Sequence, residues 1–116
     1  MKRLIFLIII LSFILCGCAG KDYHSSFYTI KVMGSPINWL RFNGCYEVYT
    51  SQGELISKSV SGIVPASYLI MDAVSISCVF QKESEDGTLK VEIVNGGKVV
   101  AKSETSATYG VVSIAI

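Results

Sequence analysis

From residue 27 onward, hydrophobic and polar side chains alternate along the chain in short runs. The clearest run is Thr88 to Val94, in which Leu89, Val91 and Ile93 are separated by charged residues. A period of two is typical of a β-strand with one buried face, and the period of a helix is not kept over about eleven residues anywhere in this region. The pattern therefore predicts strands throughout this part of the chain.

Turn signals divide the pattern into seven or eight strands. Gln52-Gly53 and Asn95-Gly96-Gly97 suit hairpin turns, because Gly and Asn tolerate a positive φ. Many short strands joined by glycine-rich turns are typical of an antiparallel sandwich. We therefore predict an all-β fold, a small antiparallel Ig-like β-sandwich whose last residues, 114–116, pair within a sheet. The expected strands are 27–33, 39–50 with an interruption at Asn43-Gly44, 54–60, 68–71, 72–80, 88–94, 98–103 and 109–116.

The middle of the chain carries two more detailed expectations. In residues 72–80, alternation places Val74, Ile76, Cys78 and Phe80 on one face, which we expect to be buried. Residues 82–86 then hold one basic and three acidic side chains, Lys82, Glu83, Glu85 and Asp86, and end at a glycine. We expect a solvated turn there rather than an acid–base pair.

The first residues follow a different pattern, with a basic start and one continuous apolar run. Lys2 and Arg3 precede twelve residues, Leu4 to Leu15, of which Ser12 is the polar one. As a helix this run would rise about 18 Å, well short of the roughly 30 Å hydrocarbon core of a bilayer. A basic start, a short apolar run and a small-residue exit are typical of an export signal.

The exit of this segment resembles the lipobox of bacterial lipoproteins. Leu15 stands at position −3, Gly17 at −1 and Cys18 at +1, whereas Cys16 at −2 departs from the usual small residue. The resemblance implies that a diacylglyceryl group is attached to the thiol of Cys18 and that signal peptidase cuts before it. Fatty acid, such as palmitate, would then acylate the new amino terminus. Acyl chains of this number hold a protein at the membrane.

These patterns predict three parts: a lipoprotein signal peptide over 1–17, a lipidated N-terminus and tether over 18–26, and the β-sandwich domain over 27–116. The domain would face the periplasm or the cell exterior. In a Gram-negative cell, Ala19 after the cysteine resembles the signal for the outer membrane. An ordinary signal peptide and an uncleaved anchor helix are the alternatives.

The region from Tyr28 to Ile116 also distantly resembles the periplasmic domain of MmpS-like proteins, which are β-sandwich accessories of RND-type exporters. The resemblance rests on Tyr-Thr-Ile-Lys-Val-Met-Gly-Ser at 28–35, Ile-Val-Pro at 63–65 and Val-Glu-Ile-Val-Asn-Gly-Gly-Lys-Val-Val-Ala at 91–101. Ala66 stands where that family usually has a tryptophan after the proline. The resemblance implies a role as an accessory subunit beside a transporter.

Charge and length narrow the functional classes. The 116 residues carry a formal net charge of +1, and removal of Lys2 and Arg3 with the signal leaves 8 basic side chains against 9 acidic ones. A chain of this size forms one domain. Its near-neutral charge gives it no electrostatic attraction for nucleic acid.

The sequence offers no set of catalytic or metal-binding residues. The one histidine, His24, lies in the tether, and no nucleophile motif or phosphate-binding glycine loop occurs. A structural zinc site needs clustered ligands, which the remaining cysteines do not supply. We therefore expect a protein that is not an enzyme and has no cofactor or metal.

Cys45 and Cys78 form a candidate disulfide, because an exported chain meets an oxidising compartment. Cys78 lies on an apolar face, whereas Cys45 is in register with Glu47 and Tyr49 on a more polar one. A bulge at Asn43-Gly44 would reset that register. Two buried free thiols are the alternative.

Aromatic residues are the remaining functional candidates. Trp39, Tyr46, Tyr49 and Tyr68 form a candidate binding face, because aromatic side chains are enriched in interfaces. The alternative is that they belong to the core and rim of the sandwich. We expect a membrane-anchored binding or accessory module with a protein partner in the envelope. The alternative functions are those of an MmpS-like exporter subunit and of a phage-type lipoprotein that occludes a receptor.

Overall fold

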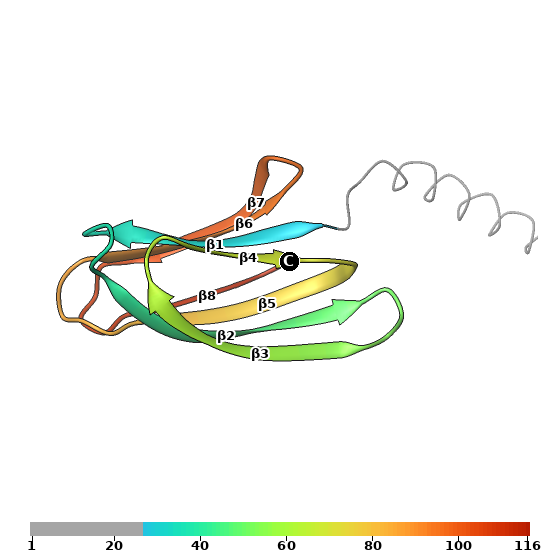
Figure 1. The fold of residues 1–116 in the computed structure, drawn as a ribbon, viewed down its shortest axis with the longest axis horizontal. Coiled ribbons are helices and arrows are strands. Elements are labelled where there is room, and N and C mark those ends of the chain that lie inside the picture. The colour runs from blue at the N-terminus through green and yellow to red at the C-terminus, as the bar shows by residue number, and fades with distance from the viewer. Residues whose placement is uncertain (1–26) are drawn as a thin grey trace, which may run out of the picture.

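The computed structural model describes residues 27–116, which form two four-stranded β-sheets packed face to face (Figure 1). Within these residues every strand pairing is antiparallel. The strands are β1 (Tyr28–Ser35), β2 (Arg41–Thr50), β3 (Leu55–Ile63), β4 (Ala66–Ile70), β5 (Ala73–Lys82), β6 (Thr88–Asn95), β7 (Lys98–Thr105) and β8 (Val111–Ala115). The predicted all-β sandwich of seven or eight strands is thus confirmed, with eight.

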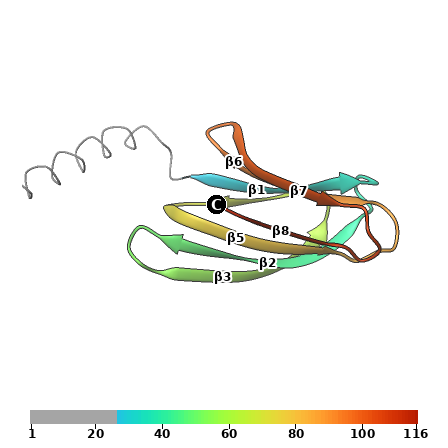
Figure 2. The ribbon, with the colours of Figure 1, turned by 180° about the vertical axis from the view of Figure 1, so that it is seen from behind.

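The two sheets have the strand orders β4-β1-β6-β7, called sheet A here, and β3-β2-β5-β8, called sheet B. The β2–β3 and β6–β7 hairpins stay within one sheet, and the other connections cross between the sheets (Figures 1 and 2). Gly53, Gly96 and Gly97 have positive φ values of 85°, 60° and 79°, as the hairpin turns predicted from the sequence require.

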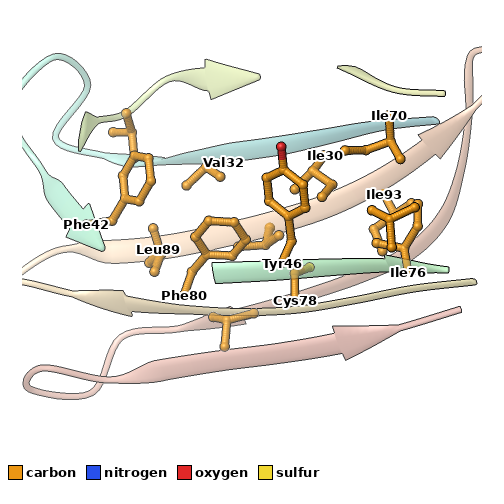
Figure 3. Packing of buried hydrophobic residues seen from close by; sticks show 14 of the residues in the cluster. Ile30, Val32, Phe42, Tyr46, Ile70, Ile76, Cys78, Phe80, Leu89 and Ile93 are labelled. Atoms are coloured by element: carbon orange, nitrogen blue, oxygen red, sulfur yellow. The ribbon is translucent and has the colours of Figure 1, made fainter. Parts of the chain in front are cut away.

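The core lies between the sheets and is built from alternate residues of the central strands (Figure 3). Ile30 of β1 and Leu89, Val91 and Ile93 of β6 are fully buried from the side of sheet A. Across from them, the rings of Phe42 and Phe80, both labelled in Figure 3, pack edge to face with their centroids 5.7 Å apart. Burial of each such side chain stabilises the fold by about 1.5–3 kcal/mol relative to exposure.

Strand β2 runs without a break through Asn43-Gly44, where the sequence predicted an interruption. Gly44 pairs with Val60 on one side and Phe80 on the other, in an unshifted register. A Cβ at Gly44 would clash with the carbonyl oxygen of Val79 and with the ring of Phe80. The glycine is therefore needed because the strands approach closely here, not because the strand ends.

Val74 lies outside the core, where the sequence predicted it inside. The register between β2 and β5 shifts between Tyr49, which pairs with Ser75, and Thr50, which pairs with Ala73. Val74 is the extra residue of this β-bulge, and its side chain is 61% exposed. Ile76, Cys78 and Phe80 are buried as predicted.

Lys82 also differs from the prediction, because it is buried and does not belong to a solvated turn. Its residue is 0% exposed at the end of β5, and its Nζ donates a hydrogen bond of 2.6 Å to the carbonyl oxygen of Gly87. The lysine thereby ties the β5–β6 loop to the end of the sandwich. Glu83, Glu85 and Asp86 follow in that loop.

The strand order gives the sandwich two distinct ends. One end, called the proximal end, carries Phe27 and the turns β2–β3, β4–β5 and β6–β7. The opposite end, called the distal end, carries the β1–β2, β3–β4, β5–β6 and β7–β8 connections and lies at the left of Figure 1. Within the described residues, no helix is long and apolar enough to cross a membrane.

Candidate functional site

Trp39 lies at the distal end, in the loop between β1 and β2, and 66% of its surface is exposed. Backbone hydrogen bonds of the residues before and after Trp39 hold the loop in place. The N–H of Leu40 donates to the carbonyl oxygen of Pro36 at 3.1 Å, and the N–H of Asn38 donates to the carbonyl oxygen of Val64 at 3.0 Å. The indole is thus presented to solvent by a backbone that is fixed to the β3–β4 corner.

The β5–β6 loop is fixed beside this loop by both backbone and side-chain bonds. The N–H of Glu83 donates to the carbonyl oxygen of Arg41 at 3.0 Å, and its Oε2 accepts a bond of 2.8 Å from Nδ2 of Asn43. The N–H of Tyr109 in turn donates to the carbonyl oxygen of Ser84 at 3.0 Å. The connections at the distal end therefore form one braced unit, which would lose little conformational entropy on binding.

Between these loops lies an open hollow of ≈ 410 Å³, called the distal hollow. It is lined by residues of the β1–β2 and β5–β6 loops and by the adjoining end residues of β2 and β3: Asn38, Trp39, Arg41, Ile63, Glu83 and Ser84. The indole and the Ile63 side chain supply apolar surface, while Arg41 and Glu83 supply one charge of each sign. Trp and Arg are the residue types that most often anchor protein interfaces, so the chemistry of the hollow suits a protein partner.

A second open hollow, of ≈ 600 Å³, lies on the outer face of sheet B. It is lined by small or uncharged residues, which are Asn43, Gly44, Cys45, Ser59, Val60, Ser61, Val79, Gln81 and Val111. Asn43 links the two hollows, because it lines this one and bonds Glu83 of the distal hollow. The outer face of sheet B thus continues the surface that begins at Trp39.

The four aromatic residues proposed from the sequence do not form one face. Tyr46 points into the core, where its ring lies 5.8 Å from that of Tyr68. Burial, followed by the neighbouring Tyr46, raises the pKa of Tyr68 above its usual value. Tyr49 is exposed but lies at the proximal end of β2, so Trp39 alone of the four belongs to the distal hollow.

Cys45 and Cys78 are both free thiols, and they are on opposite faces of sheet B. Cys78 pairs with Tyr46 in the ladder and is buried in the core, whereas Cys45, one residue earlier on β2, is exposed on the outer face. The bulge that would have turned Cys45 inward is absent at Asn43-Gly44. The candidate disulfide is therefore not formed, and burial raises the pKa of the Cys78 thiol to about 11.

The lipobox residues Leu15, Gly17 and Cys18 lie outside the described residues. Residues 27–116 contain no group of three or more His, Cys, Asp or Glu side chains placed to hold a metal ion. Comparison with protein-family models found no match, and no curated protein matches the chain significantly. The resemblances to lipoproteins and to MmpS-like proteins therefore remain predictions from the sequence.

Proposed function

We propose that this chain is a non-enzymatic envelope lipoprotein, anchored through Cys18, that binds a protein partner with its distal end. The anchor rests on the lipobox-like residues Leu15, Gly17 and Cys18. The binding role rests on one structural observation, the exposed Trp39 on a braced loop beside Arg41 and Glu83. A core residue of this size would instead be buried.

The position of the distal hollow supports this assignment. The described chain begins with Phe27 at the proximal end, so the proposed tether, residues 18–26, leaves from the end opposite to Trp39. Nine extended residues reach up to about 30 Å. The membrane anchor would thus leave the distal end accessible to a partner.

Mass spectrometry of the protein purified from membranes tests the anchor. We expect an N-terminal Cys18 that carries diacylglycerol and fatty acid. The Cys18→Ser variant would keep an unprocessed amino terminus and would carry no lipid. An intact Met1 without lipid in the parent protein would contradict the proposed anchor.

Photocrosslinking in cells tests the binding role. A photoreactive amino acid at Trp39 should give one covalent product with a defined partner protein, because this side chain would lie inside the interface. The matched control is the same photoreactive residue at Tyr49, which is exposed at the opposite end of β2. Equal products from both positions, or none from Trp39, would contradict binding through the distal end.

A further inference from the structure

Strand β3 differs from the other sheet edges in the described part of the chain. It is nine residues long, Leu-Ile-Ser-Lys-Ser-Val-Ser-Gly-Ile, and most of it is exposed. The edge strands β4 and β8 have five residues each, and β7 carries Lys98, Lys102 and Glu104. Short length and charge are the usual protections of an edge against pairing, and β3 has one charged residue along its length.

The free hydrogen-bonding groups of β3 can be assigned from its two ends. The N–H of Thr50 donates to the carbonyl oxygen of Glu54, and the N–H of Val64 donates to that of Leu40. In an antiparallel ladder, hydrogen-bonded pairs alternate with pairs that are not bonded. In the bonded pairs at both ends, the residue adjoining β3 is even-numbered, so the even-numbered residues of β3 hydrogen-bond to β2. The odd-numbered residues 55, 57, 59, 61 and 63 therefore direct their N–H and C=O groups to the open edge.

The same odd-numbered residues are self-complementary about Ser59. If a second β3 lies antiparallel with Ser59 opposite Ser59, then Ser57 faces Ser61 and Leu55 faces Ile63 of the other copy. Leu55 and Ile63 are 62% and 40% exposed in the single chain, so this pairing covers apolar surface at both ends. Opposed serines in the middle can exchange hydrogen bonds across the strands.

The inner face of β3 is compatible with the same register. Lys58 faces Val60 of the other copy rather than a second lysine, and Ile56 faces Gly62. A Cβ at Gly62 would meet the Phe42 ring at an ordinary 3.6 Å, so there is room beside this ring. A shift of the centre to Lys58 would instead place two lysines directly opposite, which is unfavourable.

We propose that two copies of this chain associate through β3, antiparallel and centred on Ser59, so that the two copies of sheet B form one continuous sheet. The symmetry of the residue pattern about Ser59 favours a second copy over the strand of another protein, which would not require it. The interface is isologous, as in most homodimers. The interface takes in Ile63, which also lines the distal hollow, and it places the distal end of each copy beside the proximal end of the other. The two proposals therefore share part of one surface, and the tests below measure only the association of two copies.

Disulfide trapping in the purified full chain in detergent tests the register. Cys45 lies directly opposite Ser59 on β2, so the experiment uses a Cys45→Ser background that must itself give no linked dimer. On mild oxidation, Ser59→Cys should link to itself as a dimer. Ser57→Cys and Ser61→Cys should each remain unlinked, because like positions would be about 13 Å apart. A mixture of these two variants should give the linked heterodimer.

A charge at the centre tests the association without a disulfide. Ser59→Lys places two like charges directly opposite and should shift the protein from dimer to monomer in analytical ultracentrifugation, while Ser59→Thr should remain a dimer. Circular dichroism checks that both variants keep the fold. A monomeric parent protein would overturn the proposal. Linking of Ser57→Cys to itself as fast as Ser59→Cys would also overturn it.

Discussion

Cys45 and Cys78 belong to neighbouring residue pairs of the β2–β5 ladder, and their environments are opposite because a strand directs successive side chains to opposite faces. Cys78 lies among Tyr46 and the core of sheet B, and Cys45 is open to solvent in the larger hollow. The two thiols therefore differ in chemistry. Cys45 has the access that a reactive thiol requires, whereas burial keeps Cys78 protonated, which lowers its reactivity.

The raised pKa of Cys78 predicts a loss of stability at alkaline pH. The folded pKa is about 11 against an ordinary value of 9.0, so the unfolded chain releases this proton first as the pH rises. Ionisation of this thiol therefore leaves the free energy of unfolding unchanged below about pH 9 and lowers it by about 2 kcal/mol by about pH 11. Urea unfolding at a series of pH values measures this loss. The Cys45→Ser variant should retain most of the effect, because burial is a larger cause of the raised pKa than the neighbouring Cys45, and Cys78→Ala should reduce it. An equal fall in both variants would contradict the assignment.

Gly44 predicts a second effect at the scale of one residue. Gly44→Ala should lower the free energy of unfolding by about 1–3 kcal/mol, because the new methyl group clashes with the Val79 carbonyl and the Phe80 ring. Gly62→Ala on the neighbouring strand is the matched control, since its methyl group would make an ordinary contact with Phe42. Urea denaturation compares the two variants. A similar loss at both positions would argue against close packing at Gly44.

At the scale of elements, the β6–β7 hairpin depends on two consecutive residues with positive φ, Gly96 and Gly97. Gly96→Asn should leave the thermal stability almost unchanged, because asparagine adopts this backbone region readily. Gly96→Val should cost about 1–2 kcal/mol, since a β-branched residue is strained there. Thermal unfolding of both variants tests this. Equal stability of the two would mean that the turn changes its conformation.

The strands were largely predictable, and the faces of some residues were not. Alternation identified β6 and the buried part of β5, because the period of two follows directly from strand geometry. The bulge at Val74 was missed because the register of β5 is set by its pairing with Tyr49 and Thr50. Lys82 was expected in solvent because its acceptor, the Gly87 carbonyl, is supplied by the folded loop.

At the scale of the molecule, the core and the candidate site use different aromatic residues only three positions apart. Trp39→Ala should change the free energy of unfolding by less than about 0.5 kcal/mol, since the indole is exposed. The same variant should abolish binding of the proposed partner. Phe42→Ala should cost about 3–5 kcal/mol, because its ring is buried against Phe80. Urea denaturation measures the change in the free energy of unfolding for both variants. A large loss of stability in Trp39→Ala would place the indole in the structural framework instead.

The sequence indicated Trp39 as a candidate but could not supply its surroundings. Arg41, Ile63 and Glu83 reach the distal hollow from separate segments of the chain. Their proximity follows from the crossing of connections between the two sheets, which local pattern does not encode. For the same reason, the grouping of Trp39 with Tyr46, Tyr49 and Tyr68 was wrong, since that grouping used residue type without position along the strands.

The bulge in β5 has a consequence for changes in chain length. Removing one residue from a strand normally turns every later side chain to the other face of the sheet. Val74, however, has no partner position of its own in the ladder, since Ala73 and Ser75 already pair with Thr50 and Tyr49. A chain lacking Val74 would keep Ile76, Cys78 and Phe80 in the core and would lose one exposed apolar side chain. The start of β5 is thus a place where this sandwich can absorb a deletion during its evolution.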